Sequence, residues 1–361
     1  YQALSLQQPM RWAQGDALER ITDNALLFNE LPAWPADGQA IDYSQAEQRE
    51  LCAAPQRLAR FYALLSSAHY RTSPLDLRRL MDAPGMHFGL AKAEQEVVGA
   101  VWLVDEGGLS AELAHDVWAG RRRPRGNLVA QSLAAHGGQW WAPTLHSRRI
   151  TRIATLPALR RQGIARQLVE RQRRQAQGLD FLSVSFGYTE PLWRFWQSCG
   201  FELVRIGSKP EASSGCYTAM AILPLSEQGE ALRHAAHKHL ARDWPWLRQR
   251  IELALAIPGD DGDTPLGEED WRELAGFAFA HRPLEASLGA LQRLLLASNL
   301  PLPALRGHLQ RRQSPAACAE QAGVSGQKAL LRHWRHETAQ ALEQLNAQHC
   351  RYWRDWAQSL Q

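Results

Sequence analysis

A turn that opens a basic helix carries the clearest chemical signal in this chain of 361 residues. Residues 152–166 have the pattern of a strand, a turn with the spacing Arg160-x-x-Gly163-x-Ala165, and the first turn of a helix. Small residues in such a turn let a ligand approach the backbone closely. The first N–H groups of a helix have no intrahelical acceptor, and they favour an anion. The sequence therefore predicts a turn that binds a pyrophosphate.

Positive charge is concentrated around this turn. The chain has 41 Lys and Arg against 37 Asp and Glu, yet residues 121–174 contain thirteen arginines and a single acid, Glu170. Their net charge of +12 leaves −8 for the rest of the chain. A solvated face is the ordinary interpretation of charged runs, but this excess favours an anionic partner, either nucleic acid or a phosphorylated cofactor. The candidate nucleic-acid contacts are the arginines outside the turn: Arg121, Arg122, Arg123, Arg125, Arg148 and Arg149.

Composition excludes several other classes of protein. Apolar residues make up 45% and charged residues 22%, values typical of a globular protein. No run of 18 apolar residues predicts a membrane helix, and no signal peptide follows Tyr1. Five scattered cysteines without a C-x-x-C pair argue against a disulfide framework or a zinc site and favour the cytoplasm. Since the first residue is not Met, we expect a piece of a longer protein.

Periodicity predicts an α+β domain followed by an all-α domain. We expect helices over residues 44–70, 74–82, 159–177 and 190–199, and strands over 87–91, 97–104, 149–155, 181–187, 202–206 and 216–223. After Pro224 the pattern is helical throughout. The predicted domains are 1–45, 46–225 and 226–361; the first is the end of a preceding module with its linker. The triad His234-x-x-His237-x-His239 falls in the last domain, and we interpret it as a solvated basic face and expect no metal site.

The turn and its surroundings resemble the Gcn5-related N-acetyltransferases. The spacing Arg160-x-x-Gly163-x-Ala165, the strand that follows, and the exit Cys199-Gly200-Phe201 match the second half of that fold in order. The resemblance implies a mixed sheet with a splayed cofactor cleft and acetyl-CoA as cofactor. The residues that it assigns to acetyl-CoA are Ile153, Ala154, Thr155, Arg160, Arg161, Gln162, Gly163, Ile164, Ala165 and Arg166, with Pro191 and Ser198.

Longer strings are similar to the bacterial tRNA(Met) cytidine acetyltransferases. They occupy residues 71–78, 82–85, 123–131, 180–189, 192–196, 204–207 and 211–220. This resemblance implies transfer of acetyl from acetyl-CoA to the exocyclic amine of the wobble cytidine of elongator tRNA(Met). It implies that the anticodon region of the tRNA is bound, that the chain is the C-terminal half of such an enzyme, and that it has no membrane partner. We favour a monomer.

The family's ATPase module has no counterpart in this sequence. That module contains a phosphate loop, whereas this chain has no G-x-x-x-x-G-K-[ST] pattern. ATP with Mg²⁺ is therefore expected only for a longer protein. The segment from Pro9 to Trp12 resembles the end of the module, which makes Arg11 a remnant ATP ligand.

Three residues are candidates for proton transfer. His87 follows the string Asp82-Ala-Pro-Gly-Met, where the family has a His, although a hydrogen-bonded core histidine is the alternative. Tyr188 and Glu190 lie near the thioester by analogy with the fold. The position from which many relatives protonate the thiolate holds Trp196, so Tyr217 or a water could serve instead. We expect the cytidine to stack on Trp193, Trp196 or Tyr188.

Two other functions remain open at this point. One is an acetyltransferase that acts on a protein or a small amine. The other is an RNA-binding piece without catalytic activity. The arginines outside the turn favour RNA over a small amine, because a cofactor diphosphate needs only two or three of them.

Overall fold

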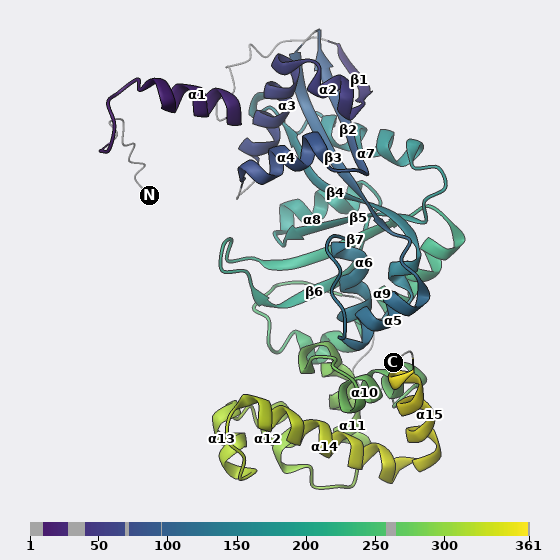
Figure 1. The fold of residues 1–361 in the computed structure, drawn as a ribbon. Helices are drawn as coiled ribbons and strands as arrows, with labels where there is room; N and C mark the ends of the chain where they lie inside the picture. The colour runs from purple at the N-terminus through teal and green to yellow at the C-terminus, as the bar shows by residue number, and fades with distance from the viewer. Residues whose placement is uncertain (1–9, 28–39, 69–71, 95, 258–264, 360–361) are drawn as a thin grey trace. The chain divides into compact units, whose positions relative to one another are not determined.

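The computed structural model describes residues 10–27, 40–68, 72–94, 96–257 and 265–359 (Figure 1). The chain divides into two compact units. The first contains residues 1–104 and 150–175, and the second contains residues 105–149 and 176–361. The long strands β3 (Glu96–Gly107) and β4 (His146–Thr155) each continue from one unit into the other along the chain.

The first unit contains four neighbouring strands in the order β1-β2-β3-β4. Strand β1 (Ile41–Ala46) is antiparallel to β2 (Met86–Ala93), and β2 is antiparallel to β3, with Phe88 opposite Trp102. The described helices of this unit are α1 (Ala17–Leu26), α2 (Gln48–Cys52), α3 (Pro55–Ser67), α4 (Pro74–Asp82), the 3-10 turn η2 (Pro157–Leu159) and α7 (Ile164–Gln175).

Two predicted helices of this unit needed correction. The helix expected over residues 44–70 begins as β1 and continues as α2 and α3, because Pro55 lacks the N–H that would extend α2. The helix expected from residue 159 begins five residues later, at Ile164. Helix α4 begins where predicted: Ser73 and Asp76 form a capping box, and Pro74 occupies the first helical position.

Helix α7 packs on the sheet of the first unit through a small set of side chains. Ile164, Leu168 and Val169 are buried, and so is the polar Gln172. A Cβ at Gly89 of β2 would lie 2.7 Å from Nε2 of Gln172 and 2.7 Å from Cγ1 of Val101, so the absence of a side chain there leaves room for Gln172. This packing fixes the position of α7 and therefore of the turn from which the helix begins.

The second unit contains the start of β4 and the strands β5 (Phe181–Gly187), β7 (Tyr217–Pro224) and β6 (Glu202–Pro210), in that order. Strand β7 is antiparallel to both of its neighbours. The described helices around these strands are α5 (Ala111–Ala119), α6 (Leu128–Ala135), the 3-10 turn η1 (Ala142–Thr144), α8 (Glu190–Ser198) and α9 (Glu227–Leu247). The strand predicted over residues 202–206 is confirmed and extends to Pro210.

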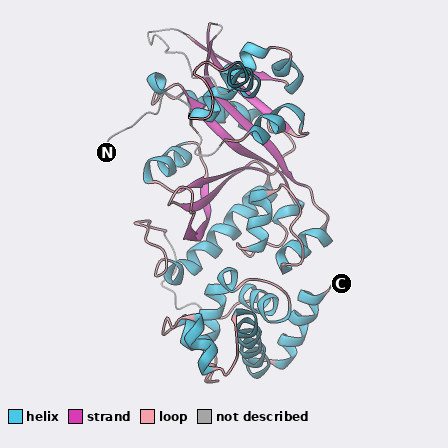
Figure 2. Ribbon diagram, turned by 60° about the vertical axis from the view of Figure 1, so that its left-hand side comes forward, coloured by secondary structure: helices cyan, strands magenta, loops and turns pink. Residues whose placement is uncertain are grey.

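The described residues after β7 form helices and no strand, as predicted (Figure 2). They are α9, α10 (Glu268–Phe279), η3 (Leu284–Ser287), α11 (Leu288–Ala297), α12 (Pro303–Leu309), α13 (Pro315–Gln321), α14 (Gln327–Leu345) and α15 (Ala347–Gln358). Their core is aliphatic and aromatic, with Leu274, Phe277, Leu291, Leu305 and Leu342 almost fully buried. Among the described residues, no helix combines the length and apolar character needed to cross a membrane.

Two arginines lie inside this helical part. Arg293 is 1% exposed at its side chain and contacts Oδ1 of Asp270 at 2.6 Å and Oδ1 of Asp243 at 2.8 Å. Arg282 is fully buried and donates to the carbonyl oxygens of Trp118, Ala134 and Ala286. Oxygen acceptors of this kind offset much of the cost of burying a guanidinium group, although Nε of Arg282 has no hydrogen-bond partner among the described residues.

Candidate cofactor turn and nucleic-acid interface

The predicted pyrophosphate turn connects β4 to α7 in the first unit. After Thr155, the N–H of Leu156 donates to the carbonyl of Val98, η2 follows, and α7 begins at Ile164. Gly163 has φ +82° and Arg161 has φ +64°, so the backbone is left-handed at two positions of the turn. A conformation of this kind favours glycine and is strained for arginine.

Space around Gly163 is open to a ligand. A Cβ built at Gly163 would have no described atom within 4 Å, so the space beside the backbone is open to a ligand. The backbone conformation at this position, with its positive φ, is what favours glycine. The first intrahelical bond nearby is donated by Gln167 to the carbonyl of Gly163. The N–H groups of the residues between them precede this ladder, as an anion site needs.

The turn also presents positive side chains. Arg160, Arg161 and Arg166 are exposed, and none forms an ion pair with a described carboxylate. Ala154 is buried, whereas Ile153 and Thr155 are partly buried. The residues predicted for acetyl-CoA from β4, the turn and α7 therefore lie along one continuous piece of backbone. Gln162 belongs to the exposed part of that turn.

Tyr188 and Glu190 form a hydrogen-bonded pair at the start of α8, in the second unit. The hydroxyl of Tyr188 donates to Oε2 of Glu190 at 3.1 Å, and Nε of Arg194 donates to Oε1 at 2.8 Å. Burial and the neighbouring carboxylate raise the pKa of Tyr188 to about 12. Arg194 and Tyr188 lower the pKa of Glu190. At neutral pH the pair is thus a protonated phenol and an ionised carboxylate.

The other predicted residues around α8 and β2 have simpler surroundings. Pro191 occupies the first turn of α8, and the hydroxyl of Ser198 donates to the carbonyl of Phe195. Both residues are exposed. His87 lies on β2 opposite Leu103 and is partly buried. Arg11 precedes α1 and is exposed.

Trp193 and Trp196 are core residues. Only 8% and 2% of their surfaces are exposed, and the ring of Trp196 contacts those of Phe195 and Phe201 at centroid distances of 4.8 and 5.2 Å. The expectation that a cytidine stacks on these two indoles is wrong, because other aromatic rings already cover them.

Most of the predicted nucleic-acid arginines contact the protein itself. Nε of Arg149 lies 2.6 Å from Oε1 of Glu106, a buried carboxylate that also accepts from the first N–H groups of α6. Arg148 pairs with Asp105 at 2.8 Å and is 12% exposed at its side chain. Nη1 of Arg123 donates to the carbonyl of Val117 at 2.6 Å. The acids that pair with Arg148 and Arg149 thus lie outside residues 121–174.

Two arginines of that set remain directed to solvent. Arg122 and Arg125 are exposed, and neither side chain forms an ion pair with any described carboxylate. Arg121 differs from both, since it pairs with Asp116 at 2.6 Å and its side chain is 16% exposed. The positive charge that these arginines can offer to an anionic ligand is therefore smaller than the sequence count indicates.

The histidine triad is only partly a solvated face. His239 is 7% exposed and lies between two carboxylates, 3.5 Å from Oδ2 of Asp243 and 3.6 Å from Oε1 of Glu273. In the part of the chain described, these three residues are the group that could hold a metal ion. Arg293 and Arg282 already oppose the two carboxylates, so a divalent cation would meet two nearby positive charges. His239 is therefore buried beside two carboxylates, and the prediction of a solvated face is wrong for this residue.

Sequence reasoning did not single out Arg205 and His136. Arg205 stands between apolar residues on β6, and His136 ends α6. The available signal was an arginine between the apolar residues Val204 and Ile206. Tertiary structure places both residues at one cavity.

Comparisons with known proteins match two different regions of the chain to two different families. A family model described as GNAT acetyltransferase 2 matches residues 60–173 and 160–226, and one described as tRNA-binding domain matches residues 229–348. The chain is 57% identical to the tRNA(Met) cytidine acetyltransferase TmcA of Pectobacterium atrosepticum, over 98% of this chain and 53% of the relative. Identity to the TmcA of Photorhabdus asymbiotica is 56%, over 98% of this chain and 52% of that relative.

The chain spans about half the length of the curated relatives it matches. Among solved structures, the ribosomal-protein-S18-alanine N-acetyltransferase of Escherichia coli aligns over 52% of this chain and 95% of its own, with a TM-score of 0.34 and 14% identity.

Proposed function

We propose that this chain, which belongs by sequence to the tRNA(Met) cytidine acetyltransferase family, transfers an acetyl group from acetyl-CoA to the exocyclic amine of a tRNA cytidine. The supporting observation is the open, left-handed turn at Gly163 between β4 and α7, in a chain whose helical part matches a tRNA-binding domain. We further propose the wobble cytidine of elongator tRNA(Met) as the target and the cytoplasm as the site of reaction. The domain boundaries at 45/46 and 225/226 belong to this proposal.

The turn supplies the groups that a diphosphate needs. The N–H groups of residues 164–166 precede the first intrahelical hydrogen bond of α7, and Arg160, Arg161 and Arg166 add exposed positive charge. In the proposal, the edge of β4 at Ile153 to Thr155 pairs with the pantetheine arm. Backbone N–H groups at Ala154 and Thr155 polarise the thioester carbonyl.

The reacting nitrogen needs a proton acceptor of modest strength. The exocyclic amine of cytidine is neutral at pH 7, and it becomes acidic only as it attacks the carbonyl carbon. In this proposal Glu190 accepts that proton, since its carboxylate is ionised at neutral pH and hydrogen-bonded to Tyr188. Tyr188 holds the carboxylate through its hydroxyl and remains protonated, so it can also serve as a proton donor. His87 is the competing base.

Mass spectrometry of the RNA tests the proposal directly. The chain is incubated with acetyl-CoA and a tRNA(Met) transcript, with and without ATP, and N4-acetylcytidine is measured. A transcript with uridine at the wobble position is the matched control. We expect slow acetylation that the control transcript lacks, since the chain spans only about half the length of its relatives. Acetylation of an added amine or peptide, with none on tRNA, would overturn the assignment.

Binding experiments separate the remaining possibilities. Acetyl-CoA should raise the melting temperature by mass action, because it binds the folded chain. Gel filtration should give a monomer. If tRNA binds and acetyl-CoA does not, the chain is an RNA-binding piece without catalytic activity.

A further inference from the structure

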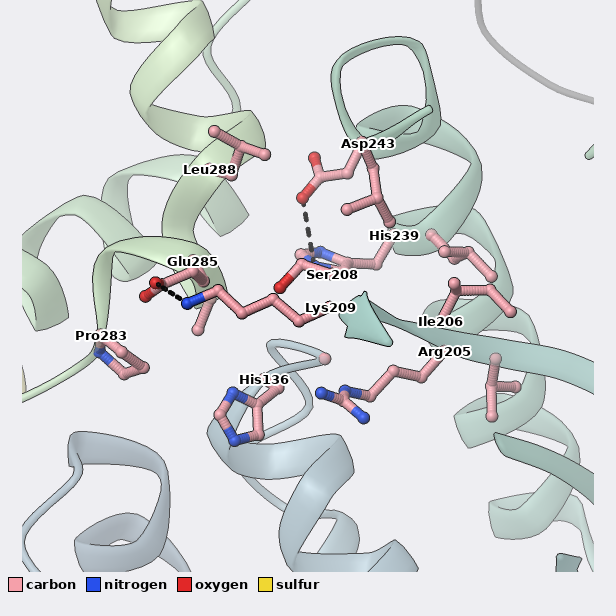
Figure 3. A pocket seen from close by; sticks show the side chains of 15 residues that line it. His136, Arg205, Ile206, Ser208, Lys209, His239, Asp243, Pro283, Glu285 and Leu288 are labelled. Atoms are coloured by element: carbon pink, nitrogen blue, oxygen red, sulfur yellow. Dashed lines mark ion pairs between the residues drawn. The ribbon is translucent and has the colours of Figure 1, made fainter. Parts of the chain in front are cut away.

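A cavity of about 260 Å³ lies in the second unit (Figure 3). Its walls come from β6, α9, η3, the start of α11 and the end of α6. Such a volume is smaller than the roughly 300–1,000 Å³ of pockets for drug-sized ligands. Three of these walls fall in the region that matches a tRNA-binding domain, which begins at residue 229. The cavity therefore suits a small group attached to a larger molecule.

Arg205 is the unusual residue of this cavity. Its guanidinium points from β6 toward His136 across the cavity (Figure 3). Among described residues its one polar contact is Sδ of Met220, 3.9 Å from Nη1, and a thioether is a weak acceptor. Burial lowers the pKa of Arg205 to about 10, which still leaves it charged at neutral pH.

Two other buried arginines of the same unit, Arg293 and Arg282, differ from Arg205 because each donates to oxygen acceptors of the protein. Arg293 has two carboxylate partners, and Arg282 donates to three carbonyl oxygens. A partly buried guanidinium with neither kind of acceptor costs stability. The contrast within one unit indicates that Arg205 is kept for a purpose other than folding.

The acids at the cavity do not neutralise Arg205. Asp243 is paired with Arg293 at 2.8 Å, and Glu285 is paired with Lys209 at 3.6 Å. Because Asp243 and Glu285 already have these partners, the positive charge of Arg205 is not neutralised by a carboxylate at the cavity. Ser208 adds a hydroxyl, and His136 adds an imidazole that burial and Arg205 keep neutral, with its pKa lowered to about 3. A neutral imidazole can donate one hydrogen bond.

We infer that this cavity is a binding site for a backbone phosphate of the tRNA, held by Arg205 with His136 and Ser208. Guanidinium groups match phosphate oxygens with two parallel hydrogen bonds. A phosphodiester provides one negative charge on a small group, which fits both the leftover charge and the volume. The inference rests on the proposed function, since it takes the RNA to be tRNA, and it adds a contact outside the cluster at residues 121–149.

Arg205→Met tests the site in the full chain, with Lys238→Ala as the control. Lys238 is exposed on α9 and does not line the cavity, so its variant removes one positive charge from the same region. Binding of tRNA is measured at several salt concentrations. We expect Arg205→Met to weaken binding by roughly 10- to 100-fold, the loss of one charge-assisted pair, and to reduce the salt slope by about 1. Its melting temperature without RNA should equal or exceed that of the parent chain.

The remaining outcomes separate this inference from the proposed function. If the parent chain does not bind tRNA, the proposed function itself fails. If the parent binds and Arg205→Met binds with the same affinity and slope, only the phosphate site is overturned. Inorganic phosphate is the second probe: if it stabilises the parent but not the variant, while tRNA binding is unchanged, the site takes a small free anion and the RNA assignment is wrong.

Arg205→Lys covers the case in which the methionine variant does not fold. It keeps the charge but loses the paired geometry, so we expect weaker tRNA binding with an unchanged salt slope. Unchanged affinity in this variant would also overturn the site.

Discussion

Nε of Arg121, in the loop that follows α5, lies 2.6 Å from Oδ1 of Asp116 in that helix. The other two nitrogens of the same guanidinium donate to the carbonyl oxygens of Ala357 and Ser359, at the C-terminal end of α15. A positive side chain at this position satisfies helix carbonyls that have no intrahelical donor. Arg121 therefore joins two parts of the second unit that lie far apart in sequence.

This relationship divides the arginine cluster into members that contact the protein and members that are exposed to solvent. We expect Arg121→Ala to lower the free energy of unfolding by about 1–3 kcal/mol, because Asp116 and two carbonyls lose their donor. The salt dependence of tRNA binding should stay unchanged. Denaturant unfolding and binding at three or more salt concentrations measure the two effects.

The paired variant Arg122→Ala with Arg125→Ala should behave in the opposite way. Both side chains are exposed, so stability should change little, whereas each lost phosphate contact should reduce the salt slope by about 1. Acetyl-CoA binding is the internal control and should not change. Unaltered affinity and slope would show that these two arginines are simply solvated.

Gly163→Glu should abolish measurable acetyl-CoA binding. The new side chain places a carboxylate in the open space next to the start of α7 and is also strained at φ +82°. Gly163→Ala carries the same backbone strain without the charge, so it isolates the electrostatic part of the loss. Calorimetric titration of both variants should show a much smaller loss for alanine. Equal losses would mean that backbone shape alone decides binding.

Asp270 should contribute stability that depends on pH. Burial alone would raise its pKa, but Arg293, the N–H of Gly267 and Arg242 outweigh that effect and lower it. A lowered pKa stabilises the folded state above the pKa of the unfolded state, about 3.9, and this contribution is lost as the pH falls through the folded value. Asp270→Asn should therefore cost about 3–5 kcal/mol at pH 7 and progressively less below about pH 4. Urea unfolding across that range is the measurement, and a cost independent of pH would contradict it.

The pKa of His136 should depend on the charge of Arg205. Burial is the main reason why the pKa of His136 lies at about 3, and the charge of Arg205 is the next. Removing that charge with Arg205→Met makes protonation of the imidazole less costly, so its pKa should rise toward the ordinary value. An NMR titration of the histidine ring protons follows this shift, and Lys238→Ala should leave it in place. No shift in Arg205→Met would mean that the two side chains do not face each other in solution.

Local patterns in the sequence were enough to predict the strands β5 and β7, the start of α4 and the cofactor turn. Each depends on residues close together in the chain: alternating apolar side chains, Ser73 before Pro74, and Gly163 before a helix. The longer strings were enough to indicate the family. Where a proline interrupts a periodic pattern, as at Pro55, the same local information was misjudged, and one helix became a strand and two helices.

Tertiary structure alone decided which charges are available to a ligand. Arg121, Arg148 and Arg149 look like Arg122 and Arg125 in sequence, yet their partners include Ala357, Asp105 and Glu106, and pairing at such separations depends on the fold. The same holds for Trp196, which the fold covers with other rings, and for Arg205, which the fold surrounds with carboxylates that already have partners of their own. Electrostatic and packing energies depend on the distance between groups in space. For residues that are tens or hundreds of positions apart in the chain, only the tertiary structure sets that distance.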